Sequence, residues 1–220
     1  EYFLMHNFWQ DLLAKALPLS LAGVLAIQPA LALSQPQVPQ GWVSPFSDVA
    51  QGDWYYPFVA ALNGADVVHG YDDGRFGSHD ATRAGDAILM VLKAAGNGTR
   101  TPQPGAHYAS GYVDYGVRRG WLVREQVPDL NGTVSRLFIA QLAAKALGVV
   151  PIADAPAFAD TDDGYAAALY RLGILAGEES GGTRLFHPDS PITRAELSTI
   201  VWRVQQYAAR TAGSSDYFSF

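Results

Sequence analysis

The chain repeats itself, and this internal repeat restricts the folds open to it more than any other feature of the sequence. The first and last thirds of its 220 residues match most clearly. The matched segments are FSDV at 46–49 with FADT at 158–161, FVAALNGADVVHG at 58–70 with YAAALYRLGILAG at 165–177, and FGSHDATRAGDAILMVL at 76–92 with FHPDSPITRAELSTIVWRV at 186–204. Such a period is typical of repeat proteins, whose units are each too small to bury their own apolar face. We therefore expect the units to share one core.

The middle third carries a weaker copy of the same pattern. YVDYGVRRGWLV at 112–123 is followed by NGTVSRLFIAQLAAKALG at 131–148. This copy lacks both the FxD start and the turn-like segment GYDDGRF found at 70–76. A Ser/Thr-Arg pair nevertheless recurs at 82–83, 135–136 and 193–194, at intervals of 53 and 58 residues. The sequence thus predicts three units.

Each unit reads as a helix, a loop and a second helix. In two first helices the apolar residues stand at i, i+3, i+4 and i+7, the spacing of one helix face. They are Phe58, Ala61, Leu62 and Ala65, and Tyr165, Ala168, Leu169 and Leu172. Each first helix ends at a residue suited to the left-handed conformation, which is Asp66, Gly120 or Gly173. The expected fold class is all-α, with about six main helices.

The second helix of the last unit begins in an unusual way. Thr193 is a predicted N-cap, and Glu196 three residues later completes a T-x-x-E capping box. Arg194 then occupies the first helical position, where the helix dipole favours anions and disfavours cations. Nothing in capping requires an arginine. We interpret it as a receptor for a carboxylate or phosphate, assisted by the backbone N–H groups of the helix end.

The other two units repeat the Ser/Thr-Arg pair. Thr82-Arg83 and Ser135-Arg136 predict the same N-cap followed by arginine, although neither unit has the capping-box glutamate. A single copy would be an ordinary solvated arginine, but three copies favour a binding role. The predicted ligand-binding residues are Arg83, Arg136, Arg194, Thr82, Ser135 and Thr193.

Composition and motifs argue against several other functions. The net charge of −6 gives little electrostatic support for nucleic-acid binding. The chain has no cysteine, which removes disulfides, thiol chemistry and cysteine zinc sites. No H-E-x-x-H or G-x-S-x-G motif is present, so we expect no enzyme, no catalytic residues, no metal and no cofactor.

Two acidic segments leave weaker alternatives. Asp72-Asp73 and Asp162-Asp163 could form the acid pair of a glycosidase. Both pairs stand next to a glycine, as aspartates in turns commonly do. The segment DTDDG at 160–164 resembles the start of a calcium loop but lacks its later ligands.

The N-terminal segment predicts export. From Met5, a polar stretch with Lys15 is followed by an apolar run at 16–27 and by an A-x-A pattern at 30–32. This is the layout of a secretory signal peptide cleaved after Ala32. An uncleaved membrane anchor is the alternative, but the run is short for a bilayer span of about 20 residues. We expect no membrane contact after cleavage.

The combined motifs resemble S-layer homology domains. They are FSDV with GADVVHGYDDGRF and TRA in the first unit, and FADT with LGILAG and PDSPITRAE in the last. The resemblance covers about residues 44–207 and implies three tandem repeats, of which the second is divergent. The implied domains are a signal peptide at 1–32, a linker at 33–44, repeats at 45–98, 99–150 and 151–210, and a tail at 211–220.

The resemblance also implies a fold, a ligand and a location. Three such repeats are expected to form a pseudo-threefold prism around a central helical bundle. Grooves between repeats would bind a secondary cell-wall polysaccharide bearing pyruvate ketals and hold a secreted protein at the cell wall. The TRAE arginine, the family's carboxylate-binding residue, maps to Arg83, Arg194 and Arg136. The residues expected to support binding are Asp48, Asp160, Trp54, Gly70 and Gly177.

The resemblance implies a non-catalytic module with one or two working grooves. A structural or protein-interaction scaffold of the cell envelope is the first alternative, and a cell-wall hydrolase is the second. A Gram-positive wall is the expected setting, although some bacteria with two membranes use similar repeats.

Overall fold

The computed structural model describes residues 35–153 and 156–215. The predicted signal peptide at 1–32 lies outside the described residues. The α-helices of the described part are α4 (Tyr56–Gly64), α5 (Ala84–Leu92), α6 (Ser110–Arg118), α7 (Arg136–Ala146), α8 (Gly164–Arg171) and α9 (Arg194–Ser215). A π-helical turn, η1 (Lys93–Asn97), and a 3₁₀ turn, η2 (Arg124–Gln126), complete the helical elements of this part. Six α-helices in the described residues confirm the expected number.

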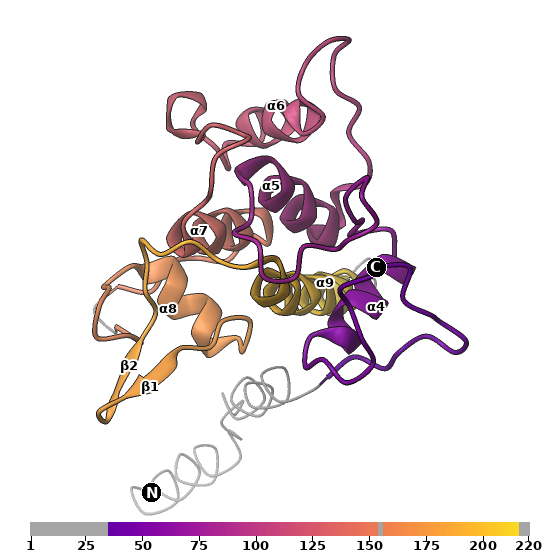
Figure 1. Ribbon diagram of the computed structural model, residues 1–220. Coiled ribbons are helices and arrows are strands. Elements are labelled where there is room, and N and C mark those ends of the chain that lie inside the picture. Colours follow the sequence, from indigo (N-terminus) through magenta and orange to yellow (C-terminus); the bar gives the residue numbers. More distant parts are fainter. Residues whose placement is uncertain (1–34, 154–155, 216–220) are drawn as a thin grey trace, which may run out of the picture.

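The helices alternate along the chain between an inner and an outer place. Figure 1 shows α5, α7 and α9 in the middle, with α4, α6 and α8 around them. We name residues 45–98 unit 1, residues 99–150 unit 2 and residues 151–210 unit 3. Each outer helix packs on the inner helix of another unit, since α4 contacts α9, α6 contacts α5 and α8 contacts α7.

Each outer helix ends where the sequence predicts. Asp66, Gly120 and Gly173 all have a positive φ, at 58°, 73° and 71°. This left-handed conformation stops the helix and redirects the chain. The position therefore has the same backbone geometry in all three units.

Three loops join the units through their backbones. Isolated β-bridges connect Ala81 with Thr193, Arg83 with Thr133, and Ser135 with Pro191. Each loop leads directly into an inner helix, so the bridges align the N-termini of α5, α7 and α9. Every unit is thereby paired with both of the others.

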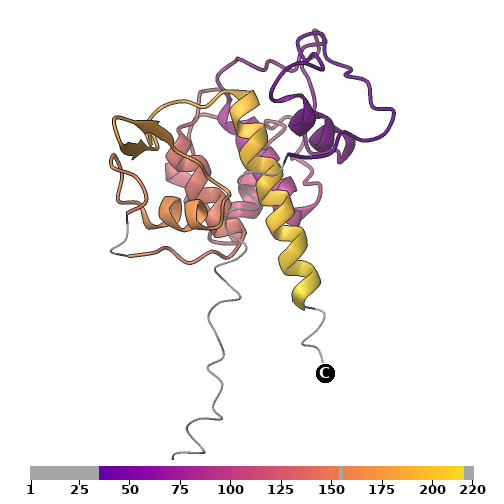
Figure 2. The same ribbon diagram turned by 90° about the horizontal axis from the view of Figure 1, so that it is seen from below.

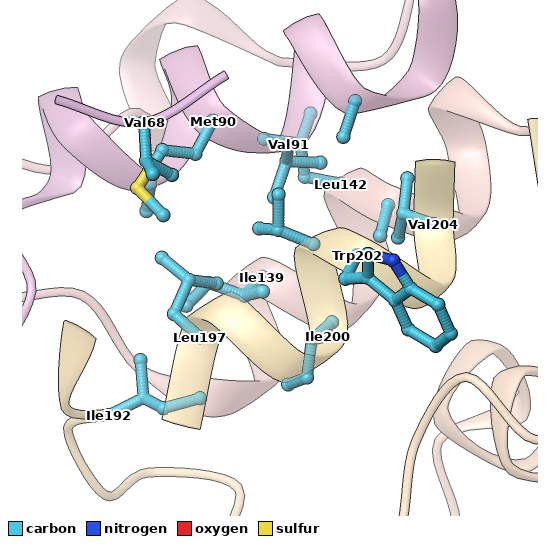
Figure 3. Packing of buried hydrophobic residues seen from close by; sticks show 14 of the residues in the cluster. Val68, Met90, Val91, Ile139, Leu142, Ile192, Leu197, Ile200, Trp202 and Val204 are labelled. Atoms are coloured by element: carbon cyan, nitrogen blue, oxygen red, sulfur yellow. The ribbon is translucent and has the colours of Figure 1, made fainter. Parts of the chain in front are cut away.

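The core lies between the three inner helices. Met90 and Val91 of α5 meet Ile139 and Leu142 of α7 and Leu197 of α9 (Figure 3). All of these side chains are buried. Burying one such side chain contributes about 1.5–3 kcal/mol relative to leaving it exposed. All three units therefore supply one shared core, as the internal repeat predicts.

The all-α prediction is correct for the main elements but misses one hairpin. Strands β1 (Glu178–Ser180) and β2 (Thr183–Leu185) pair antiparallel in unit 3. Gly181 and Gly182 form the turn with positive φ values of 57° and 81°, as two-residue hairpin loops require. The hairpin stands where unit 1 has its short turn around Gly74.

The segments that flank the repeats also have defined places. The Trp42 ring packs edge-on against Tyr56, and its Nε1 donates to Asn63. The described part of the expected linker thus packs on α4. At the other end, α9 extends beyond the remaining helices (Figure 2). Among the described residues, no helix combines the length and apolar character needed to cross a membrane.

Candidate functional site

The bridges give the residue-by-residue equivalence between the units. They place Thr193 and Ser135 in the same position as Arg83, not Thr82. Backbone hydrogen bonds agree, because Ala84 N–H donates to Gly132 just as Arg194 N–H donates to Asp80. Unit 1 is therefore shifted by one residue from the alignment that the shared letters TRA suggest.

This shift corrects the predicted cap of unit 1. Arg83 itself is the N-cap residue of α5 and provides no side-chain cap, while Ala84 takes the first helical position. Thr82 is fully buried at the position of Ile192 and Val134, and its hydroxyl has no hydrogen-bond partner among the described residues. The prediction that Thr82 caps a helix beginning at Arg83 is wrong.

The caps of the other two units are confirmed. The Ser135 hydroxyl accepts from Phe138 N–H at 3.2 Å. Thr193 and Glu196 form the complete capping box, with Thr193 N–H to Glu196 at 2.9 Å and Glu196 N–H to Thr193 at 3.2 Å. Aligning the letters TRA places Gly85 at the position of Glu196 and so leaves unit 1 without the acidic residue. The backbone pairing shifts unit 1 by one residue and places Asp86 at that position instead.

Arg194 crosses from unit 3 into unit 1 and is almost fully enclosed there. Its Nε donates to Phe76 O at 2.8 Å and its second terminal nitrogen to His69 O at 2.9 Å. The remaining terminal nitrogen pairs with Asp86 at 2.6 Å. Only 4% of the Arg194 side chain is exposed. The cation that the helix dipole disfavours is thus neutralised by a carboxylate of the neighbouring unit.

Arg136 makes a looser version of the same contact from unit 2 into unit 3. Its Nε donates to Phe186 O at 2.9 Å, which matches the bond from Arg194 to Phe76. Its terminal nitrogen lies 3.6 Å from Glu196, whose side chain is 45% exposed. We call each pair, Arg194–Asp86 and Arg136–Glu196, an inter-unit clasp.

The third contact of this kind, from unit 1 into unit 2, has neither the arginine nor the acidic residue of a clasp. The first helical position of α5 is Ala84, and the position of Asp86 and Glu196 is occupied in α7 by Phe138. An arginine and an acid are therefore present together at two contacts and missing together at the third. This pattern indicates that the acid balances the arginine.

Backbone N–H groups at the helix ends are already used. In α9, Arg194 N–H and Ala195 N–H donate to Asp80 O and Ser78 O at 3.1 and 3.0 Å. The first two amides of α5 and α7 are bonded to neighbouring loops in the same way. The prediction that backbone amides at the helix ends assist in anion binding is therefore wrong for the first two amides of α5, α7 and α9.

Asp48 and Asp160 hold the loops that receive the arginines. The Asp48 carboxylate accepts from Phe76, Gly77 and Ser78 N–H at 2.6, 2.8 and 3.1 Å. Asp160 accepts from Phe186 and His187 N–H at 2.8 and 2.7 Å. Burial alone would raise the pKa of each carboxyl, but these backbone donors outweigh it and lower the pKa. Neither aspartate caps an outer helix, because the N-cap residues of α4 and α8 are Tyr55 and Asp163.

Gly70 and Gly177 allow close packing. A Cβ on Gly70 would lie 2.6 Å from the Phe46 ring and 2.7 Å from Arg75 O. A Cβ on Gly177 would lie 2.8 Å from both Phe158 and Leu185 O. These contacts give both glycines a packing role.

Three hollows lie at equivalent places along the inner helices. Groove 1, of about 890 Å³, is lined by residues that include Gly70, Tyr71, Arg83, Asp86, Tyr108 and Arg194. Groove 3, of about 110 Å³, contains Trp54, Arg136, Glu196 and Arg203. Groove 2, of about 50 Å³, is lined by Trp121, Phe138 and Lys145 among others. Of these, groove 1 alone has room for more than one sugar ring.

Groove 1 also brings in a residue that the sequence argument missed. Tyr108 of unit 2 stands two residues before α6, as Trp54 stands two residues before α4. It is 45% exposed, and its hydroxyl donates to Asp86 at 2.6 Å. Burial and Asp86 raise the pKa of Tyr108, while Arg194 and Arg83 oppose the shift. The sequence does hold a signal for Tyr108, because it is an aromatic residue at the same position before its helix as Trp54.

Arg83 differs from the other two arginines of the prediction. It is exposed on the wall of groove 1, and its side chain forms no hydrogen bond or ion pair within residues 35–153 and 156–215. Groove 1 thus brings Arg83 and Arg194 together, whereas Arg136 lies in groove 3. No cluster of potential metal ligands occurs in this same part of the chain.

The comparison with protein families agrees with the two most similar units. The model of the S-layer homology domain matches residues 45–89 and 151–198. These two segments are S-layer homology domains. Such domains are in general non-catalytic modules that bind cell-wall polymers and anchor proteins at the cell surface. No curated protein matches the chain.

Proposed function

We propose that this S-layer homology protein is a secreted, non-catalytic anchor that binds a secondary cell-wall polysaccharide in groove 1. The volume of groove 1, about 890 Å³, carries the proposal. Its lining includes the exposed ring of Tyr108 and the exposed side chain of Arg83. Pyruvate ketals on the sugar would supply the carboxylate that an arginine binds.

The three units are proposed to form a pseudo-threefold prism. The cyclic packing of α4 on α9, α6 on α5 and α8 on α7 supports this arrangement. The three β-bridges between the loops support it as well. In such a prism, grooves 1, 2 and 3 have equivalent backbone surroundings and differ in the side chains that line them. The lack of a clasp and the small volume of groove 2 make it a structural contact instead of a binding site.

Groove 3 is a secondary site in this proposal. Trp54 is 55% exposed beside Arg136, so it offers a flat apolar face for a sugar ring. The volume of about 110 Å³ leaves space for little more than part of one ring. Polymer binding is therefore expected to depend mainly on groove 1.

Co-sedimentation with isolated cell wall tests the proposal. The purified chain should sediment with intact wall but not with wall whose secondary polymer has been removed by acid. Tyr108→Ala should weaken sedimentation strongly, and Trp54→Ala, the matched change in groove 3, should weaken it much less. Failure of the wild-type chain to sediment with intact wall would overturn the proposal.

A further inference from the structure

The two arginines of groove 1 have different roles. We propose that Arg83, which does not correspond to the TRAE arginine of the other units, is the anion receptor of groove 1, and that it selects a sugar carrying one singly charged carboxylate. Arg194, which does carry the TRAE motif, is instead a fixed part of the wall. This inference rests on the proposed function and identifies the ligand class of the same groove.

Arg194 is already satisfied by the protein. Each of its three nitrogens has a partner at 2.6–2.9 Å. Its guanidinium is also covered by the rings of Tyr71 and Phe76, whose centroids both lie 4.8 Å away. A ligand carboxylate would have to displace Asp86 from a nearly dry ion pair to reach it. The desolvation that such an exchange requires makes Arg194 a poor receptor.

Arg83 has the opposite surroundings. It stands on the same wall with its side chain exposed and without a hydrogen bond or ion pair in the described part of the chain. Arg75, which also lines the groove, is held by Asp73 at 2.9 Å and by Asp80 at 3.5 Å. Arg83 is therefore the arginine of groove 1 whose planar fork is ready for a carboxylate.

The charge of the groove restricts the anion. Its lining holds three arginines and four aspartates, which leaves a net charge of −1. A doubly charged phosphate or a dense polyanion would meet these carboxylates and be repelled. A single carboxylate can pair with Arg83 alone while its sugar ring lies against the exposed face of Tyr108. The expected ligand is thus a sugar with one negative charge.

Titration of the full chain with small sugars, followed by NMR, tests this selection. The probes are glucuronic acid, glucose 6-phosphate and glucose. The wild-type chain should respond to glucuronic acid at residues of groove 1, and more weakly or not at all to the other two. Arg83→Gln should weaken glucuronic acid binding by about tenfold to a hundredfold, because hydrogen bonds to a charged group are lost. Arg83→Lys should recover part of the affinity, since it restores the charge without the fork.

Arg118→Gln is the matched control. Arg118 is an exposed arginine at the end of α6 outside groove 1, so its replacement removes the same charge without touching the site. Equal binding by Arg83→Gln and wild type, or a preference for glucose 6-phosphate, would overturn the inference. Wall sedimentation separates the two proposals. A wild-type chain that does not sediment overturns both, whereas undiminished sedimentation of Arg83→Gln overturns only the role of Arg83.

Discussion

The two clasps offer a comparison within one molecule, because the same pair of charges is buried in one and exposed in the other. In the first clasp, Arg194 and Asp86 are 4% and 18% exposed and lie 2.6 Å apart. In the second, Arg136 and Glu196 are 19% and 45% exposed and lie 3.6 Å apart. Asp86→Asn and Glu196→Gln each remove one negative charge while preserving shape and an oxygen acceptor. The difference between their effects on the free energy of unfolding therefore shows how much burial changes the contribution of the ion pair.

We expect Asp86→Asn to lower the free energy of unfolding by about 3 kcal/mol. Removing one member of a fully buried pair costs roughly 3–5 kcal/mol, and the partial exposure of Asp86 places this case at the lower end. Exposed pairs contribute about 0–1 kcal/mol, so Glu196→Gln should cost less than about 1 kcal/mol. Its amide oxygen can still complete the capping box with Thr193.

Urea unfolding followed by circular dichroism measures both values. The double variant Arg194→Met/Asp86→Asn should lose less stability than the sum of its single variants, because the second change removes the charge that the first leaves unpaired. Equal losses for Asp86→Asn and Glu196→Gln, or additive effects in the double variant, would refute the burial argument.

Three further changes test other parts of the structure. Thr82→Val removes a buried hydroxyl that has no hydrogen-bond partner among the described residues. It should therefore stabilise the chain by about 1 kcal/mol and raise Tm by about 3 °C. A lower Tm in calorimetry would contradict this. Gly70→Ala should cost about 1–3 kcal/mol because the added Cβ meets Phe46 and a backbone oxygen, while Gly52→Ala, with nothing within 4 Å, should be neutral in urea unfolding. Asp48→Asn should destabilise the chain at neutral pH; burial raises the pKa of Asp48, but backbone donors lower it below the ordinary 3.8, so the carboxylate stabilises the fold above that pH. The gap between wild type and Asp48→Asn should therefore narrow as the pH falls below 3.8 and the carboxylate becomes protonated, and a gap that does not change with pH would show that the charge is not responsible.

Much of the fold could be predicted from local chemistry. Helix periodicity identified two of the outer helices, α4 and α8, and Asp66 marked the end of α4 although the other units have glycine there. The Thr193 capping box is set by residues three apart, so it too could be read directly from the sequence. Local signals of this kind need no knowledge of the neighbouring unit.

The errors arose where distant residues decide the outcome. The letters TRA align Arg83 with Arg194, but the backbone pairing of Arg83 with Thr133 places it one position earlier. Asp86 and Arg194 are 108 residues apart, so their ion pair leaves no local pattern. The free backbone amides expected for anion binding were likewise taken by loops of other units. The general region of the site was predictable, but the division of roles between its arginines was not.

Mapping the bound polymer onto the chain tests the central claim most directly. Hydrogen exchange would be measured on the purified chain with and without polymer released from the wall. If groove 1 binds the polymer, protection should increase at residues 69–71, around Arg83 and at Tyr108, with little change around Trp54 in groove 3. Protection confined to groove 3, or no protection at saturating polymer, would contradict the account.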